Sequence, residues 1–377
     1  MLGRATALHE NNKKRRRTDS TAGVSSSSSP AAPIIFTSPG LKPDVRLNVL
    51  GTDFHVHSII LKLHSNFFRR FLDSPDKHPA PDSALFRYEY SSVIETDGAS
   101  AVKWVLEPGR KVSLSGLESH VKSRAPSPQT LVLDGPSMFE LPEDFKTELE
   151  VDSFRKLLCA MYNRPYAIRS VFDLTRLINL ADYYCALPIV SATLSGALLG
   201  SSIFGKTSWL TDVRDPRADL LILAMKLRHP ILFREAFIHV VGRWDPSKMM
   251  GIVQENSELM RLVMRESHAI YIRTMDTQLV LLRNRDEAAL ARGILNDDES
   301  ETMDAKFYRA IMERLQDDDP WYVGYQELRK PLDALLQNNL MLDHNGSLPG
   351  MYPYEDCFLC ANVSDEEMPW NRDEVDW

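Results

Sequence analysis

A change in hydrophobic period at Ser58 limits the folds that this chain can adopt. Over residues 44–56, apolar residues alternate with polar ones on both sides of a turn, which is typical of a β-hairpin. From Ser58 to Leu72 the apolar residues recur at helical spacing, and Ser65 or Asn66 stands where a second helix would be capped. A hairpin that leads directly into a pair of helices predicts an α+β fold.

The rest of the first half mixes strand and helix patterns. Two strand-like segments at 86–94 and 101–106 flank a turn, and a Gly-, Ser- and Pro-rich stretch at 108–130 predicts a loop. A further short strand is predicted at 137–141. Helical segments follow at about 151–162, 170–186, 188–200 and 216–228.

The second half shows helix-compatible patterns without strand signals. Helices are predicted at 230–243, 255–292, 302–316 and 320–340. In the longest of these segments, apolar residues stand among paired charges, as in an amphipathic helix that faces a core. These apolar residues are Leu259, Leu262, Val263, Ile270, Ile272 and Leu279.

The chain divides into four predicted regions. With 377 residues and 44% hydrophobic content, it is long enough for about two domains, each with its own core. The regions are a disordered basic and Ser-rich tail at 1–42, an α+β domain at 43–204 with an insertion at about 75–136, an all-α helical domain at 205–345, and an acidic tail at 346–377. This last region carries Trp370 and Trp377 and could dock on a basic groove of this molecule or of a partner, although a solvated tail is the favoured interpretation.

Composition and charge limit the environment and the partners. The net charge of −8 argues against a surface built to hold nucleic acid, so direct nucleic-acid binding is not expected. Four cysteines and the lack of a long apolar segment predict an intracellular protein with no membrane span.

A basic run near the N-terminus predicts nuclear import. Its five consecutive cations, Lys13, Lys14, Arg15, Arg16 and Arg17, stand in a Ser-flanked segment that an import receptor would read as an extended peptide. We therefore expect the nucleus as the location and an import receptor as a partner, with the cytoplasm as the alternative.

The strongest chemical motif is a literal phosphate-loop pattern at 200–207. Gly200 and Gly205 would let backbone N–H groups surround phosphates, Lys206 would neutralise them, and Thr207 would hold magnesium. Such a loop requires a strand before it and a helix directly after it, whereas the preceding residues have helical character. A helix end followed by a loop is therefore the favoured interpretation, and no cofactor is expected.

A second motif has the spacing of half a zinc site. Cys357 and Cys360 are separated by two residues, and His344 is the nearest further ligand type in sequence. Zinc requires four ligands, so two packed thiols are favoured over a metal site. Cys159 and Cys185 stand at helical spacing among apolar residues, which favours core packing for both. No sequence signature of an enzyme nucleophile or catalytic metal occurs, and we expect no catalytic residue.

The order of elements across 43–200 resembles a BTB/POZ domain, especially the version abundant in filamentous fungi. Three groups of residues carry the resemblance: the first strand and hairpin, the opening of the helical region, and a later helix. They are Asp44, Val45, Phe54, His57, Ser65, Phe67 and Phe68; then Leu141, Pro142, Phe154 and Tyr162; then Ala181, Asp182 and Tyr184.

This resemblance implies a protein-interaction adaptor with a small sheet, helical hairpins and an inserted β-hairpin and loop. A BTB/POZ domain buries an apolar face against a second copy or a protein partner. Cullin-recruiting relatives carry a hydrophobic-x-Glu motif that residues 138–140 match literally. A nuclear, transcription-associated adaptor and a substrate receptor of a cullin ubiquitin ligase thus remain alternatives, beside a nucleotide-binding enzyme that uses Lys206 and Thr207.

Overall fold

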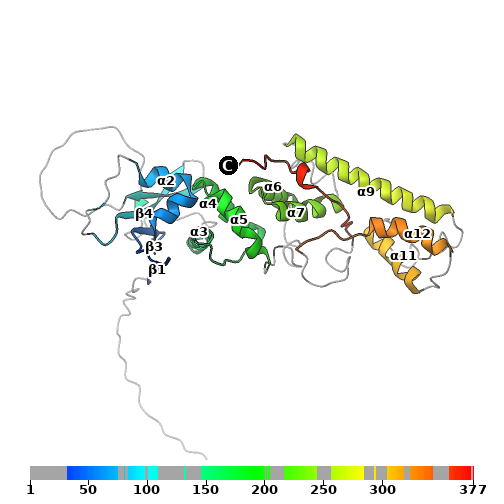
Figure 1. The fold of residues 1–377 in the computed structure, drawn as a ribbon, viewed down its shortest axis with the longest axis horizontal. Helices are drawn as coiled ribbons and strands as arrows, with labels where there is room; N and C mark the ends of the chain where they lie inside the picture. The colour runs from blue at the N-terminus through cyan, green and yellow to red at the C-terminus, as the bar shows by residue number, and fades with distance from the viewer. Residues whose placement is uncertain are drawn as a thin grey trace, which may run out of the picture. The chain divides into compact units, whose positions relative to one another are not determined.

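The protein has a mixed α+β fold, seen in a computed structural model (Figure 1). Residues Pro33–Trp377 form one compact unit. The structure describes residues 32–74, 80, 84–97, 101–108, 131–132, 146–199, 201, 203, 216–243, 256–283, 293, 304–317, 323–342, 356–374 and 377. Within these ranges, no helix has both the length and the apolar character needed to cross a bilayer.

The strands form one sheet with the order β1-β3-β2-β4-β5, and β6 also pairs with β4. The strands are β1 (Ile34–Ile35), β2 (Val45–Val49), β3 (Thr52–Val56), β4 (Tyr88–Asp97), β5 (Ala101–Pro108) and β6 (Leu131–Val132). The predicted hairpins β2–β3 and β4–β5 are both antiparallel, and β2 runs parallel to β4. The strand predicted at 137–141 lies outside the described residues.

The β2–β3 turn shows why the hairpin is tight. Leu50 and Gly51 both have positive φ, at 50° and 85°, as a two-residue hairpin turn requires. Leu50 is not a glycine, so this conformation costs energy, and its N–H donates to Ser92 Oγ on β4 at 2.7 Å. The turn is thereby fixed to the neighbouring strand.

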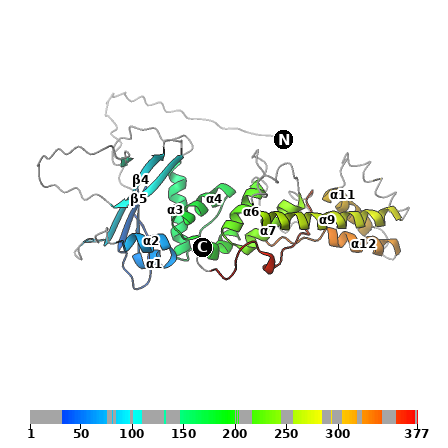
Figure 2. The same cartoon turned by 90° about the horizontal axis from the view of Figure 1, so that it is seen from above.

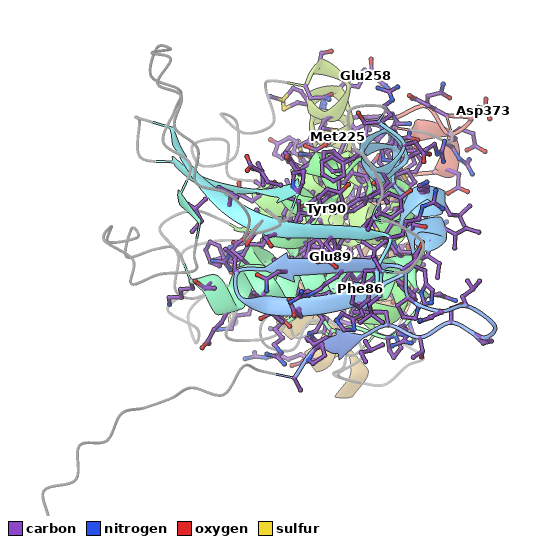
Figure 3. All side chains as sticks on the ribbon, turned by 90° about the vertical axis from the view of Figure 1, so that its left-hand side faces the viewer. Phe86, Glu89, Tyr90, Met225, Glu258 and Asp373 are labelled. Atoms are coloured by element: carbon purple, nitrogen blue, oxygen red, sulfur yellow. The ribbon has the colours of Figure 1, made fainter. Side chains whose placement is uncertain are left out.

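The two faces of the sheet follow the alternation of the sequence. Leu47 and Phe54, opposite each other on β2 and β3, are fully buried, and the helices lie behind the sheet in Figure 3. On the other face, Arg46 pairs with Asp53 at 2.7 Å, and Asn48 donates to the same carboxylate at 2.7 Å. The β-hairpin thus presents a core face and a polar face.

The helices of the first half pack together against the buried face. They are α1 (Ser58–His64), α2 (Asn66–Leu72), α3 (Thr147–Met161), α4 (Val171–Tyr183) and α5 (Leu187–Leu198). α3 packs on α4, α5 and α1. The predicted helix pair after the hairpin is confirmed, with Ser65 as the N-cap of α2.

The described elements after α5 are helical, as predicted, up to a 3₁₀ turn near the C-terminus. They are α6 (Pro216–Lys226), α7 (Pro230–Gly242), α9 (Ser257–Arg283), α11 (Ala305–Asp317) and α12 (Val323–Leu335). In α9, four of the six residues predicted to face the core are buried. The other two, Ile272 and Leu279, are 49% and 48% exposed, so that part of the prediction is wrong.

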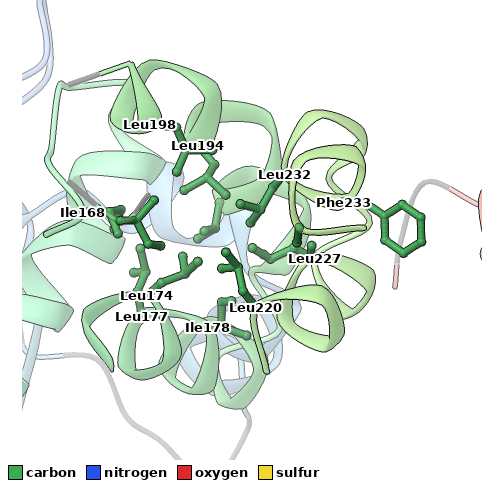
Figure 4. Close-up of a cluster of buried hydrophobic side chains, with 14 of the residues drawn as sticks. Ile168, Leu174, Leu177, Ile178, Leu194, Leu198, Leu220, Leu227, Leu232 and Phe233 are labelled. Carbon is green, nitrogen blue, oxygen red and sulfur yellow. The ribbon is translucent and has the colours of Figure 1, made fainter. Parts of the chain in front are cut away.

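The hydrophobic core continues from α4 and α5 into α6 and α7. In Figure 4, Leu177, Ile178 and Leu194 point toward Leu220 and Leu227, and all five are buried. α4 packs on α6, and the two helices lie side by side in Figure 2. Residues on both sides of the predicted boundary at 204 therefore share one core, while the boundary itself stays a prediction.

The end of the region predicted to be disordered is ordered. Residues Ile34–Ile35 pair in parallel with β3, and Phe36 is 2% exposed. The Phe36 ring lies 4.9 Å from that of Tyr162, and Arg164 donates to the Thr37 carbonyl at 2.8 Å. The prediction of disorder up to residue 42 is therefore wrong from residue 33 onward, because partners distant in sequence hold this segment.

The C-terminal segment, here residues 356–374 together with 377, is docked on the helices, which corrects the prediction of a solvated tail. Leu359, Ala361 and Val363 are buried. The N–H of Phe358 donates to the Gly242 carbonyl at 3.1 Å. A Cβ atom at Gly242 would lie 1.8 Å from the Phe358 carbonyl oxygen, so this approach requires glycine.

Further along, the segment is held by arginines and aromatic contacts. Trp370 packs edge-on against Phe233, with ring centroids 5.2 Å apart, and Phe233 points away from the core cluster in Figure 4. Arg228 pairs with Glu374 at 2.8 Å and lies 4.8 Å from the centre of the Trp377 ring. Four carboxylates of the segment, those of Asp356, Asp365, Glu367 and Glu374, thus pair with arginines of the helical half.

Candidate interaction site

The residues that resemble the BTB/POZ pattern begin with a connected polar group at the start of α1. The Asp44 carboxylate accepts hydrogen bonds from the Ser58 N–H at 2.7 Å and the Ser58 hydroxyl at 2.6 Å. The hydroxyl of Tyr162 lies 2.7 Å from the N–H and 2.8 Å from Nδ1 of His57. Burial raises the pKa of Tyr162, so the phenol stays neutral as a hydrogen-bonding group.

Ser65 joins three segments. Its hydroxyl oxygen accepts from the N–H of Phe68 at 3.0 Å, which caps α2, and its O–H donates to the carbonyl of Tyr184 at 2.5 Å. Ser65 itself is 1% exposed. One hydroxyl thus connects the α1–α2 junction to the end of α4.

We expect Ser65→Ala to lower the free energy of unfolding by about 1–3 kcal/mol, because it removes an N-cap and leaves a buried carbonyl without its donor. Urea denaturation measures this change. Ser91→Ala is the matched control, since Ser91 lies on the polar face of β4 and makes no side-chain hydrogen bond with other described residues. Equal stability losses in the two variants would contradict the role of Ser65.

An aromatic cluster lies next to Ser65. Phe68 stacks on Tyr184, with ring centroids 5.1 Å apart and an interplanar angle of 3°. Phe154 meets Tyr184 edge-on at 5.7 Å and Phe54 at 5.5 Å. These four side chains are fully buried, and burial raises the pKa of Tyr184 well above its ordinary value.

The remaining residues of the pattern are divided between core and surface. Val45 and Ala181 are fully buried, and Asp182 pairs with Lys226 of α6 at 2.8 Å. Leu141 and Pro142 lie outside the described residues. Most residues of the pattern therefore build the interior of this half of the protein, which leaves its surface for contacts with a partner.

The outer face of α1 and α2 exposes an apolar surface. Ile59 and Leu63 stand four residues apart on one side of α1 and are 61% and 66% exposed. Phe67 and Phe71 of α2 stack at 5.0 Å and are half-buried, and Tyr183 beside them is 46% exposed. We call Ile59, Leu63, Phe67, Phe71 and Tyr183 the α1–α2 surface.

Two hollows border this surface. One, of about 290 Å³, is lined by Leu63, His64, Cys185 and Ile189 among others, and burial lowers the pKa of His64. The other, of about 630 Å³, lies beside Phe67, Phe71 and Trp377. Exposed aliphatic and aromatic side chains around surface depressions are typical of protein-binding surfaces.

Helical spacing placed Ile59 and Leu63 on one helix but did not show that this side of the helix is exposed. The sequence held one sign that some of these side chains are exposed. The helix α1 has only seven residues, and four of them are large and aliphatic: Ile59, Ile60, Leu61 and Leu63. So short a helix cannot bury all of them on one face. Leu61 is the one that the structure buries completely.

The phosphate-loop residues Gly200, Gly205, Lys206 and Thr207 lie outside the described residues. The element before them is α5, a helix that ends at Leu198. A phosphate loop follows a strand, so the element that precedes the motif does not match the required context. The basic run of Lys13, Lys14, Arg15, Arg16 and Arg17 also lies outside the described residues.

The CxxC pair is packed into the core. Cys357 and Cys360 are 1% and 3% exposed, and burial raises the pKa of both thiols, that of Cys357 to about 12. His344 is outside the described residues, among which no three His, Cys, Asp or Glu side chains are grouped to hold a metal ion.

The prediction of core packing holds for Cys159 but is wrong for Cys185, which is exposed. Cys185 has a φ of 47° in the turn between α4 and α5. Its backbone carbonyl accepts from the Asn66 N–H at 3.4 Å, so the turn, and not the side chain, makes the internal contact.

Comparisons with known proteins find no matching protein-family model, no matching curated protein and no matching solved structure.

Proposed function

We propose that this protein is a non-enzymatic adaptor that self-associates through a BTB/POZ-like domain and offers its helical half to other proteins. The main support for this proposal is the exposure of Ile59 and Leu63 on one side of α1. Two large aliphatic side chains in water lose the free energy that burial would give, about 1.5–3 kcal/mol for each. A second copy of α1 would cover both.

The arrangement of the first half supports the BTB/POZ-like proposal. A hairpin followed by a helix pair, a further strand pair and three helices is the order from which the resemblance was inferred. Asp44, His57, Ser65 and Tyr162 contribute hydrogen bonds that hold this order in place. The resemblance further suggests that the partner is a protein, with a second copy as the simplest one.

The alternatives have less support. An enzyme that binds nucleotide through Lys206 and Thr207 would need a strand where α5 stands. Recruitment of a cullin scaffold rests on residues 138–140, which lie outside the described residues. A nuclear, transcription-associated role is therefore preferred within the proposal, with import through Lys13–Arg17 as its basis in sequence.

The combined variant Ile59→Asp and Leu63→Asp is expected to convert the self-associated protein to single chains, because two carboxylates from each copy would be buried together at the interface. Light scattering after size-exclusion chromatography measures the mass at about 10 µM. Leu85→Asp is the matched control, since Leu85 is 68% exposed ahead of β4. An unchanged mass in the double variant would overturn the assignment of this surface.

A further inference from the structure

A polar cavity of about 500 Å³ lies between the helical half and the C-terminal segment. Its polar lining comes from α7, α9, the chain after α12 and the C-terminal segment: Arg234, Arg273, Gln337, Asn339 and Asn362, with Cys360 beside them. The volume is in the range of small-molecule sites in proteins, about 300–1,000 Å³. The lining includes two arginines and no carboxylate among the described residues.

Two side-chain nitrogens of Arg273 are available to donate further hydrogen bonds. Its Nη1 donates to the carbonyl oxygen of Cys360 at 3.2 Å and contacts the Cys360 sulfur at 3.3 Å. Within the described part of the chain, its Nε and Nη2 have no partner and no carboxylate lies within ion-pair distance. The Nε–Nη2 edge is the side of a guanidinium that accepts a planar oxyanion through two hydrogen bonds.

Arg234 brings a second positive charge to the same cavity. Its Nε donates to the Val363 carbonyl at 3.0 Å, and its Nη2 pairs with the carboxylate of Asp365, which is 52% exposed. Glu266 is close enough to raise the pKa of the Cys360 thiol. It pairs with Arg265 at 3.1 Å and accepts from the Asn362 N–H at 3.4 Å. Arg273 itself makes no ion pair with the described residues.

The amides in the lining add donors. Nδ2 of Asn339 donates a hydrogen bond to the carbonyl oxygen of Ala361 at 3.1 Å. The side chains of Gln337 and Asn362 make no hydrogen bond with other described residues, and both residues line the cavity. Donors thus outnumber acceptors, which favours a ligand rich in acceptor oxygens.

We propose that this cavity binds a small molecule bearing a carboxylate or phosphate group, which Arg273 holds through Nε and Nη2 with Arg234, Gln337 and Asn362 around it. Cys360, Asn362 and Val363 form one wall and belong to the C-terminal segment. A ligand that needs this wall stabilises the docked segment over the released one. The cavity therefore couples ligand binding to the docking of the acidic C-terminal segment.

Thermal unfolding of the full chain tests the site, with inorganic phosphate and succinate titrated separately against chloride at matched ionic strength. A saturable rise in Tm with at least one probe is expected, and the probe that acts decides between phosphate and carboxylate. Arg273→Gln should weaken this binding at least tenfold. Arg261→Gln, an exposed arginine of the same helix, should leave it unchanged.

A second variant tests the same site if Arg273→Gln does not fold. Asn362→Asp places a carboxylate on the exposed wall of the cavity, where it should neutralise Arg273 and abolish binding. No saturable effect of either probe would overturn the proposal. Equal losses in Arg273→Gln and Arg261→Gln would also overturn it, since they would indicate attraction to general positive charge.

Discussion

Replacing Phe68 with alanine is expected to lower the free energy of unfolding by about 3–5 kcal/mol, which is a large fraction of the stability of a typical domain. Phe68 is fully buried and stacks on Tyr184, with centroids 5.1 Å apart. It also contacts Phe67 edge-on at 5.4 Å. Alanine would leave a cavity inside an aromatic cluster whose rigid rings cannot collapse into it.

Urea denaturation with a constant m-value measures this loss. Phe172→Ala is the matched control, because Phe172 stands in the first turn of α4 and is 61% exposed. The control is expected to change the free energy of unfolding by less than about 0.5 kcal/mol. A loss below about 1 kcal/mol for Phe68→Ala would contradict the packing described for this cluster.

Acid is expected to destabilise the protein through two buried histidines. His229 is the N-cap of α7: its Nδ1 accepts from the Leu232 N–H at 3.0 Å, so Nε2 carries the proton and donates to Ser195 Oγ at 3.0 Å. Burial lowers the pKa of His229 to about 4. His239 is 1% exposed, and burial with the nearby Arg217 lowers its pKa to about 3.

Both histidines stay neutral in the folded state and become charged in the unfolded state below the ordinary histidine pKa of about 6.5. The unfolded protein then binds more protons, so stability is fully present above about pH 6.5 and falls as the pH decreases toward the folded-state values. Between pH 7.5 and pH 5, each histidine should contribute a loss of about 2 kcal/mol.

Urea denaturation at several pH values measures this dependence. His229→Asn keeps an N-cap side chain for α7 and is expected to remove about half of the acid-induced loss. His268→Asn, at an exposed position of α9, is the matched control. Its free energy of unfolding should depend on pH as that of the wild type does. If His229→Asn retains the full loss, His229 is not a source of the acid sensitivity.

Much of the architecture could be predicted from the sequence because it depends on local patterns. The β2–β3 hairpin follows from alternating apolar residues, and the helices after residue 216 follow from helical spacing and caps. The switch of period at Ser58 correctly placed the boundary between strand and helix. In such segments, propensity and packing favour the same structure.

The parts that the sequence did not predict depend on contacts between residues far apart in the chain. β1 has only two residues and is ordered through β3 and Tyr162. The C-terminal segment docks through pairs such as Arg228 with Glu374, which are 146 positions apart. A charge run looks the same in sequence whether its partner is water or an arginine on another helix.

The candidate site was missed for a related reason. Helical spacing shows that Ile59 and Leu63 share a side of α1, but not whether another element covers that side. Leu61, two residues from each of them, is covered completely. The difference between core and binding surface therefore appears only once the neighbouring elements are placed.

The most direct test of the central claim is the molar mass of the full chain in solution, measured by light scattering over a range of micromolar concentrations and again with a recombinant cullin scaffold added. Self-association through α1 predicts twice the 42.9 kDa of one chain, and no complex with the cullin. A mass of one chain at every concentration would contradict self-association through α1, and a stable cullin complex would instead make the protein a ubiquitin-ligase receptor.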